Sequence, residues 1–142
     1  MGNVIEVVAA VVRRKGRVLI ASRKQEGWEF PGGKIEPGET RAAALRRELE
    51  EELSIRNALV LDELFQICRA VGPDRTVHLH FLRTMLPDDA EIIPREGQQV
   101  RWVEPEELFH CGLLPADRPL ADFLNPGSRM RNDGKRETAP RP

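Results

Sequence analysis

The stretch from Gly33 to Ile55 reads GKIEPGETRAAALRRELEEELSI and decides the fold of the chain. Its central part, residues 41–53, consists mainly of Ala, Leu, Arg and Glu, which favour a helix, and Thr40 before it is a good N-cap. This expected helix carries a leucine at every fourth position, at Leu45, Leu49 and Leu53. Such spacing predicts a helix with one buried stripe.

The same helix places three carboxylates, Glu48, Glu51 and Glu52, at positions i, i+3 and i+4. Residues at this spacing share a face, and like charges there destabilise a helix by about 0.2–0.5 kcal/mol per pair. Divalent cations such as Mg²⁺ take carboxylate oxygens, waters and substrate phosphates as ligands. The pattern therefore indicates a metal site, and the alternative is a solvated acidic face. The Gly32-Gly33 turn lets a backbone carbonyl approach the same ion.

The residues on either side of this helix predict a sheet. Apolar and β-branched runs bounded by turn residues predict strands at 4–13, 17–22, 28–30, 58–69, 76–85 and 100–103. Residues 31–33, Pro-Gly-Gly, are expected to end the extended segment without continuing regular structure. A polar loop is expected at 87–99, and short helices at 105–109 and 116–124. This order predicts one α+β domain whose sheet is covered by helices.

Length and charge limit the classes of function. The 142 residues carry 22 basic and 23 acidic side chains, a net charge of −1, which gives no general field for nucleic acid or an anionic membrane. The N-terminus lacks the features of a signal peptide, so we expect a cytoplasmic protein. Cys68 and Cys111 are expected to be reduced thiols. Residues 126–142 have almost no large apolar side chains and are expected to form a disordered tail.

With these features described, residues 33–55 resemble the Nudix box, which reads Gly-x5-Glu-x7-Arg-Glu-apolar-x-Glu-Glu-x-Gly-apolar. The matching positions are Gly33, Glu39, Arg47, Glu48, Leu49, Glu51, Glu52 and Ile55. Only the second glycine departs, since Ser54 stands there at the end of the helix, where serine is tolerable. The resemblance covers roughly residues 4–124. It implies the Nudix fold, a mixed β-sheet flanked by helices in an α/β/α sandwich, as a single domain over residues 1–125.

Segments outside the box resemble the MutT-type branch of the family. Residues 28–34, WEFPGGK, look like the approach to the box, and residues 95–98, REGQ, resemble the loop that supplies one more carboxylate. Residues 114–119, LPADRP, resemble the segment that recognises the base. The opening IEVVAA at residues 5–10 and the HLH at residues 78–80 are closest to the CTP pyrophosphohydrolase branch.

The resemblance implies a Mg²⁺-dependent hydrolase that splits nucleoside triphosphates into a monophosphate and pyrophosphate, with Mn²⁺ as a substitute metal. Its expected role is housecleaning of the nucleotide pool, on CTP, modified dCTP or 8-oxo-dGTP. The expected partner is a small nucleotide, with no nucleic acid or membrane, and both a monomer and a homodimer stay open. The alternatives are hydrolysis of ADP-ribose, NADH or a dinucleoside polyphosphate, or a catalytically weak Nudix-fold binding module.

Roles for the box residues follow from the same resemblance. Glu48, Glu51 and Glu52 are the expected metal ligands, with the backbone carbonyl of Gly32 as a further one. Arg47 is expected to orient the glutamates by salt bridges, which an arginine fork does well. Glu39 is expected to be a partner of the loop and of the helix start, or a further ligand.

Outside the box, Glu96 is the candidate general base or extra ligand, and the alternative is a solvated loop acid. Lys34 and Arg23 are expected to face the phosphates.

Asp117 is the candidate for base recognition, because an ionised carboxylate only accepts hydrogen bonds and suits the exocyclic amine of cytosine. It can also accept from a guanine, and the alternative is a helix N-cap. Phe30 is expected to line the base pocket or pack in the core.

His78 and His80 form a His-x-His pair, a spacing that is compatible with zinc. A zinc site needs three or four protein ligands, and the sequence offers no further ligand at a suitable spacing. The pair is therefore expected to line the pocket or to pack against the sheet.

Overall fold

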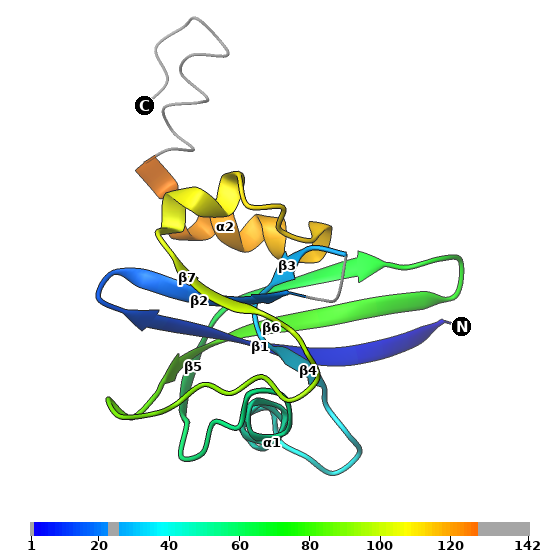
Figure 1. The fold of residues 1–142 in the computed structure, drawn as a ribbon. Helices are drawn as coiled ribbons and strands as arrows, with labels where there is room; N and C mark the ends of the chain where they lie inside the picture. Colours follow the sequence, from blue (N-terminus) through cyan, green and yellow to red (C-terminus); the bar gives the residue numbers. More distant parts are fainter. Residues whose placement is uncertain (1, 23–25, 128–142) are drawn as a thin grey trace, which may run out of the picture.

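The computed structural model describes residues 2–22 and 26–127. Seven strands and two α-helices form a single unit in this part of the chain (Figure 1). The strands are β1 (Asn3–Arg14), β2 (Arg17–Ser22), β3 (Trp28–Glu29), β4 (Gly32–Lys34), β5 (Leu59–Ala70), β6 (Arg75–Met85) and β7 (Val100–Val103). The helical elements are α1 (Arg41–Leu53), η1 (Pro105–Phe109), η2 (Pro115–Asp117) and α2 (Arg118–Leu124), and the two η elements are 3₁₀ helices.

The sheet is mixed and is organised around β1. Its order is β3-β2-β1-β6-β5, with β4 paired to β1 and β7 paired to β2. β1 runs parallel to β6 and antiparallel to β2 and β4. A parallel pair needs a long crossover connection, and here the segment containing β2, α1 and β5 supplies it.

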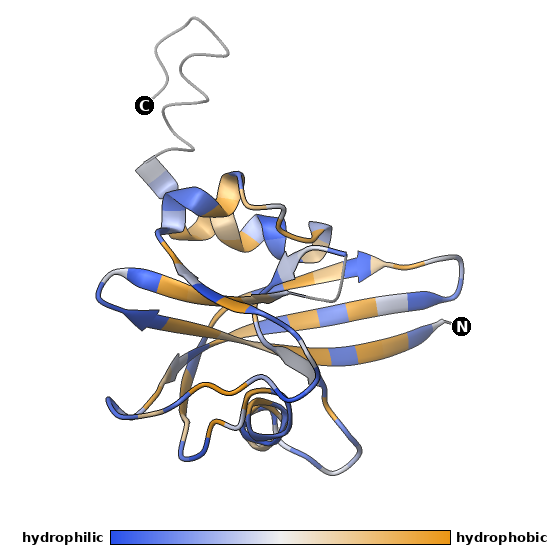
Figure 2. Ribbon diagram, viewed as in Figure 1, coloured by the Kyte–Doolittle hydropathy of each residue, from blue (hydrophilic) through white to orange (hydrophobic). Residues whose placement is uncertain are grey.

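Helices cover both faces of the sheet, with α1 on one side and α2 with η1 on the other (Figure 1). Alternate residues of β1 enter two separate cores: Ala9 and Val11 pack toward the α2 side, while Val8, Ala10 and Val12 pack toward α1. This is why the middle of β1 is uniformly hydrophobic in Figure 2, since a strand buried on both faces needs no polar side. The predicted α/β/α arrangement is confirmed.

Helix α1 forms as its sequence predicts. The Thr40 hydroxyl accepts a 3.0 Å hydrogen bond from the amide of Ala43, which caps the N-terminus. The leucine stripe predicted from the spacing, Leu45, Leu49 and Leu53, is fully buried. Ser54 ends the helix in the left-handed conformation, with φ of 60°, where the family pattern has glycine.

One structural expectation is wrong in part. Pro31 does lie in a break after β3, but Gly32 and Gly33 continue regular structure, because Gly32–Lys34 forms β4 and pairs antiparallel with Val7–Ala9 of β1. The strand approaches β1 so closely that a Cβ at Gly32 would overlap the carbonyl oxygen of Val8. Glycine at position 32 thus allows the backbones of β4 and β1 to approach closely, and does not mark a break.

Further expectations concern the ends of the chain and its cysteines. Cys68 and Cys111 are free thiols, as predicted. No helix among the described residues is long and apolar enough to cross a bilayer. Of the predicted C-terminal tail, residues 128–142 lie outside the described residues.

Candidate active site

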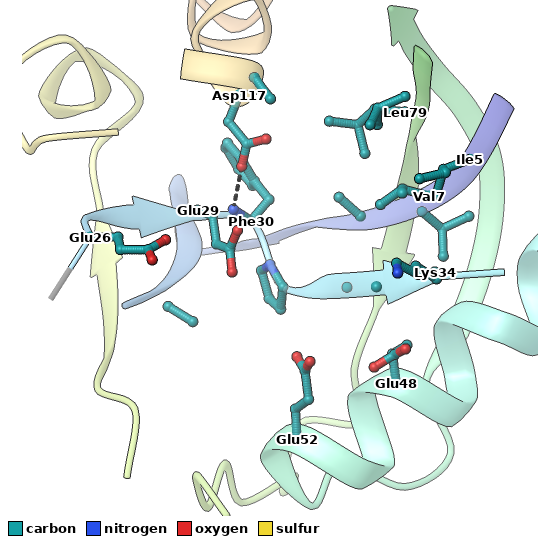
Figure 3. A pocket seen from close by; sticks show the side chains of 18 of the residues that line it. Ile5, Val7, Glu26, Glu29, Phe30, Lys34, Glu48, Glu52, Leu79 and Asp117 are labelled. Atoms are coloured by element: carbon teal, nitrogen blue, oxygen red, sulfur yellow. Dashed lines mark hydrogen bonds between the residues drawn. The ribbon is translucent and has the colours of Figure 1, made fainter. Parts of the chain in front are cut away.

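A cavity of about 780 Å³ opens between α1, the β1–β4 pair and the segments around β3 and α2. Glu48 and Glu52 project into it from α1, one turn apart, and face Glu29 and the strand that carries Lys34 (Figure 3). Glu96 also lines the cavity. We refer to Glu29, Glu48, Glu52 and Glu96 as the carboxylate cluster.

Strand β4 lies directly against one member of this cluster. A Cβ at Gly33 would overlap the carboxylate of Glu48, so glycine lets that carboxylate keep its present position. The backbone of β4 therefore lies next to the carboxylates, as expected for a strand whose carbonyls share a cation with them. The first glycine of the box is explained by this contact.

Without a cation, the ionised carboxylates of the cluster are disfavoured by burial and by repulsion from one another. Burial raises the pKa of Glu52 to about 8, and repulsion from Glu48, Glu29 and Glu96 acts in the same direction. Burial also raises the pKa of Glu48, although Arg47 opposes the shift. Ionised forms of both groups are disfavoured unless a positive charge joins them.

Arg47 connects the helix to the loop before it, as the sequence predicts for an orienting arginine. Its Nε and Nη2 atoms bind the carboxylate of Glu39 at 2.6 and 2.9 Å, and Nη1 lies 3.2 Å from Glu48 and 3.4 Å from Glu51. Nη2 also donates to the carbonyl of Lys34 at 3.0 Å. One guanidinium thus ties α1 to β4 and fixes the position of Glu48.

Glu39 has the structural role that was one of its two predicted roles. Its carboxylate accepts from the amide of Glu36 at 2.9 Å in addition to the two bonds from Arg47. Arg47 and then the Glu36 amide hold the pKa of Glu39 down to about 2. The charged pair fixes the loop between β4 and α1.

The loop that carries Glu96 is attached to the C-terminal end of α1. The amide of Arg95 donates to the carbonyl of Glu52 at 2.9 Å, and the Gln98 side chain donates to the same carbonyl at 3.3 Å. The amide of Ile93 donates to the Leu53 carbonyl at 2.8 Å. Carbonyls in the last turn of a helix lack intrahelical partners, so the loop satisfies them and holds Glu96 beside Glu52.

Another part of the cavity wall is apolar. Apolar side chains from β1 and β6, Ile5, Val7 and Leu79, form part of its wall, and Asp117 lies beside them (Figure 3). Asp117 is 5% exposed, and its Oδ2 accepts a 2.7 Å hydrogen bond from the backbone amide of Phe30. It occupies the N-cap position of α2, as the alternative expected, but its side chain makes no capping hydrogen bond there.

Most predicted site residues meet in this cavity. Its lining includes Phe30, Gly32, Lys34, Glu48, Glu52, Glu96 and Asp117. Phe30 also belongs to the core on the α2 side, so both of its expected positions apply. Glu51 lies outside the lining, with its side chain 60% exposed and bound to Arg47. Arg23 lies outside the described residues.

The structure also brings in residues that sequence reasoning missed. Glu26, Glu29, Arg69 and Arg75 line the cavity. Glu29 is the polar residue between Trp28 and Phe30 in an extended segment. This alternation is visible in the sequence, but it matches no motif that would identify Glu29 as a site residue. Arg69 and Arg75 stand near the turn between β5 and β6, and no local pattern distinguishes them from surface arginines. His78 and His80, in contrast, are absent from the lining, so of their two expected positions packing against the sheet applies and the pocket does not.

The donor set suits a hard divalent cation. It consists of carboxylate oxygens and the neighbouring backbone of β4, the oxygen-rich environment that Mg²⁺ and similar ions prefer. The raised pKa values of Glu48 and Glu52 indicate a site that is short of positive charge. Glycine at position 33 leaves the Glu48 carboxylate in its present position beside β4. The residues present therefore fit a divalent metal, as the resemblance to the Nudix box implies.

Comparison with known families agrees with this geometry. Residues 2–124 match the family model described as the NUDIX domain. The chain belongs to the Nudix hydrolase family. A curated relative, the CTP pyrophosphohydrolase of Escherichia coli, is 41% identical over 126 residues, which cover 84% of this chain and 90% of the relative. The 8-oxo-dGTP diphosphatase of Haemophilus influenzae is 33% identical over 130 residues, covering 86% and 92%.

Solved structures agree on the fold of this Nudix hydrolase. The solution structure of an Escherichia coli protein matches with a TM-score of 0.76 at 39% identity, covering 90% of this chain and 94% of that one. MutT from Aliivibrio salmonicida and Vibrio cholerae matches with a TM-score of 0.62 at 27% identity, covering 88% and 99%. The predicted family and α+β fold are thereby confirmed, and the protein is a hydrolase.

Proposed function

We propose that this Nudix hydrolase splits nucleoside triphosphates into a nucleoside monophosphate and pyrophosphate, with Mg²⁺ as its metal and a preference for cytosine nucleotides. The observation that carries the proposal is the shape of one cavity. Its carboxylate cluster lies at one end, and a buried acceptor, Asp117, lies beside apolar side chains at the other. A triphosphate attached to a flat base is a ligand with the same two ends.

The charged end accounts for the metal requirement. Three phosphates next to Glu48 and Glu52 would repel them, so the substrate needs a cation between the two sets of negative charges. Bound Mg²⁺ would neutralise phosphate oxygens, lower the pKa of a water and orient that water for in-line attack. Glu48 and Glu52 would hold the ion, together with the Gly32 carbonyl, and Glu51 is the fourth proposed ligand. Mn²⁺ has the same preference for oxygen ligands and is expected to substitute.

The remaining residues of this end orient the ligands and accept a proton. Arg47 fixes Glu48 and Glu51 through its guanidinium. Glu96, held beside Glu52 by its loop, is the proposed general base that takes the proton of the attacking water. The water oxygen adds to the β-phosphorus, the bond from that phosphorus to the bridging oxygen of the α-phosphate breaks, and the monophosphate leaves. Lys34 lines the cavity as a positive charge for the phosphates, and Arg69 and Arg75 line it beside Val77, the strand partner of Ile5, as further positive charges for the substrate.

The preference for cytosine rests on the chemistry of Asp117. One oxygen of its carboxylate already accepts from Phe30, which fixes the orientation of the group. An ionised carboxylate offers only acceptors, and these match the exocyclic amine of cytosine. The 41% identity to a CTP pyrophosphohydrolase supports the same choice.

A second candidate substrate is an oxidised guanine nucleotide. The chain is 33% identical to an 8-oxo-dGTP diphosphatase, and a carboxylate can accept from N1–H and the N2 amine of a guanine. Both substrates fit a housecleaning role in the nucleotide pool. Hydrolysis of ADP-ribose, NADH or a dinucleoside polyphosphate has less support, because the two curated relatives described above are named for nucleoside triphosphates. A catalytically weak binding module also has less support, because all the box glutamates are present.

A substrate panel tests the proposal. Pyrophosphate release is measured with Mg²⁺ for CTP, dCTP, 5-methyl-dCTP, dGTP and 8-oxo-dGTP, and hydrolysis of ADP-ribose is measured beside them. The expected result is the highest kcat/KM for a cytosine nucleotide. A higher kcat/KM for 8-oxo-dGTP would transfer the proposal to the second candidate, and a higher value for ADP-ribose would overturn it.

A further inference from the structure

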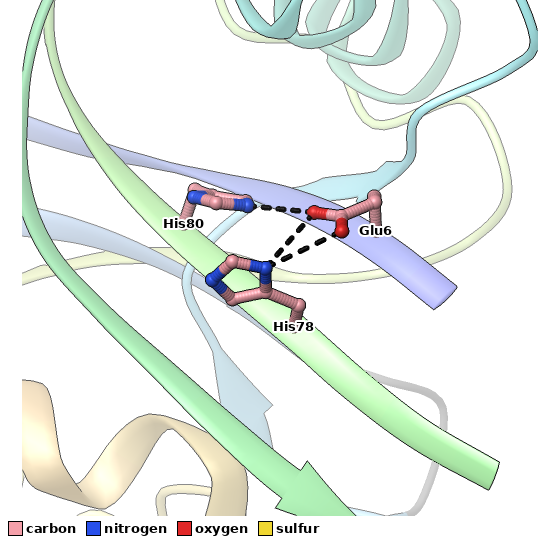
Figure 4. Close-up of side chains that lie close together, drawn as sticks. All are labelled: Glu6, His78 and His80. Carbon is pink, nitrogen blue, oxygen red and sulfur yellow. Dashed lines mark hydrogen bonds and ion pairs between the residues drawn. The ribbon is translucent and has the colours of Figure 1, made fainter. Parts of the chain in front are cut away.

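Two histidines and a glutamate form a compact group on the face of the sheet opposite the apolar wall of the cavity. Ile5 and Val7 of β1 line the cavity, and Glu6 between them points to the other face, as alternation in a strand requires. In the parallel pairing of β1 with β6, His78 is the direct partner of Glu6, and His80 follows two residues later on the same face. Figure 4 shows both rings turned toward the Glu6 carboxylate, and we call these three residues the histidine cluster.

The atoms that converge are all potential metal ligands. His80 Nε2 lies 2.8 Å from Glu6 Oε1, and His78 Nδ1 lies 3.2 Å from the same oxygen. An ionised carboxylate has only lone pairs to offer, so either a ring N–H hydrogen or a cation must lie between the two atoms of each contact. The contacts are therefore made either by N–H groups of the rings or by one cation shared by all three side chains.

The far nitrogens of both rings are already bound to acceptors. His80 Nδ1 lies 2.7 Å from Glu63 Oε1, and His78 Nε2 contacts Gln66 Oε1. The Gln66 amide is oriented by its own donation to Glu63 Oε2 at 2.9 Å. A ring that donates from its far nitrogen is left with a lone pair on the near one. Partners of this kind fix the tautomer and orientation of metal-binding histidines.

We propose that the histidine cluster binds one zinc-class transition-metal ion per chain, with water at the fourth position. Ligands of a tetrahedral zinc ion are about 3.4 Å apart, given metal–ligand distances of about 2.1 Å. The two measured contacts of 2.8 and 3.2 Å are shorter than this by a fraction of an ångström. The group is thus arranged for such an ion after a small outward movement of the Glu6 side chain, which is 43% exposed.

The choice of metal separates this site from the carboxylate cluster. Imidazole nitrogens suit zinc, copper, cobalt and nickel, whereas Mg²⁺ prefers an all-oxygen environment. His80 is fully buried, so its ring is held in place before the ion arrives. Because Glu6 lies on β1 and both histidines lie on β6, a bound ion would connect these two strands.

Zinc binding to the full-length chain tests the proposal. Protein stripped with a chelator is saturated with excess Mg²⁺ to occupy the carboxylate cluster and is then titrated with Zn²⁺ by calorimetry, with Co²⁺ absorption as a second readout. One zinc per chain is expected. Glu6→Gln and His78→Gln each remove a ligand and should weaken binding by at least about 100-fold, and Gln66→Ala should weaken it by about 10- to 100-fold.

Three matched variants serve as controls. Cys68→Ser tests the thiol directly across from His78 on β5, His110→Gln tests an exposed histidine, and Glu52→Gln tests the carboxylate cluster. All three should bind zinc as the wild type does. Absence of stoichiometric zinc, or wild-type affinity in Glu6→Gln and His78→Gln, would overturn the proposal and leave hydrogen bonds from the ring N–H groups as the contacts in the cluster. Glu6 and His78 are both partly exposed, so these variants leave the buried His80 in place and keep the fold.

Discussion

The backbone amide of Phe30 donates a 2.7 Å hydrogen bond to Oδ2 of Asp117, a residue 87 positions later in the chain. The bond joins the segment before the Nudix box to the start of α2, and it orients a buried carboxylate at the edge of the cavity. A group fixed in this way can discriminate between bases, because it cannot turn to suit a different hydrogen-bond pattern.

Asp117→Asn is expected to move the base preference from cytosine toward 8-oxoguanine. An amide oxygen still accepts from Phe30, so the fold is kept, while the amide nitrogen adds a donor that the carboxylate lacks. Base discrimination by a pair of hydrogen bonds is worth about 1–3 kcal/mol, so the ratio of kcat/KM for CTP over 8-oxo-dGTP should fall by roughly one to two decades. An identical ratio in both proteins would show that base choice lies elsewhere in the cavity.

The stability of the metal-free protein is expected to depend on Glu52. Its folded-state pKa of about 8 lies above the ordinary value of 4.5, so the protonated form is favoured in the folded protein. The contribution of Glu52 to stability is therefore complete below about pH 4.5 and is lost as pH rises through 8. Urea unfolding across this range, in chelator and in Mg²⁺, measures the effect.

Two controls separate this effect from others. Glu52→Gln should flatten the fall in stability between pH 4.5 and 8, and Mg²⁺ should reduce it in the wild type. Glu39 acts in a different window, because its pKa of about 2 means that its contribution is lost as pH falls below 4.5. The same slope in wild type and Glu52→Gln would show that Glu52 is not the group responsible.

Glu96→Gln tests the general base. If Glu96 takes the proton of the attacking water, its amide variant should lower kcat by about 10²- to 10⁴-fold with little change in KM. Glu91→Gln is the matched control, since Glu91 is an exposed acid of the same loop that does not line the cavity. Equal rates and pH profiles in the two variants would return Glu96 to the class of solvated loop acids.

Substitution of the two glycines of β4 is expected to have different effects, one mainly on kcat and the other mainly on the free energy of unfolding. At Gly33 a new Cβ meets the movable Glu48 carboxylate, so Gly33→Ala should change the free energy of unfolding by less than about 1 kcal/mol but reduce kcat by roughly 100-fold. At Gly32 it meets the backbone of β1, so Gly32→Ala should destabilise the fold by about 2 kcal/mol or more. Unfolding and rate measurements on both variants check the contrast. The prediction fails if Gly33→Ala keeps full activity.

Much of the fold could be predicted from local signals in the sequence. Helix α1 was predicted with its cap and its buried leucines, because propensity, capping and spacing all act within a few residues. The positions of Glu48 and Glu52 in the site could be predicted for the same reason, because both follow from the spacing within the helix. Strand β4 was missed because Pro-Gly-Gly looks like a break, and only contact with β1 shows that the glycines permit pairing.

Long-range pairing explains the remaining omissions. Glu6 stands 72 residues before His78, and nothing short of the β1–β6 register brings them together. Sequence spacing offered no third ligand for zinc beside His78 and His80, and the structure supplies one. Arg69 and Arg75 likewise enter the cavity only because the β5–β6 hairpin extends to its edge.

The most direct test of the central claim is product analysis for CTP with Mg²⁺, in wild type and Glu52→Gln. The wild-type enzyme should produce CMP and pyrophosphate in equal amounts. Glu52→Gln should form them roughly 100- to 1,000-fold more slowly, because an amide keeps the shape of Glu52 but loses the charge that holds the ion. Circular dichroism should show an intact fold. Release of CDP and orthophosphate, or wild-type turnover in folded Glu52→Gln, would contradict the account.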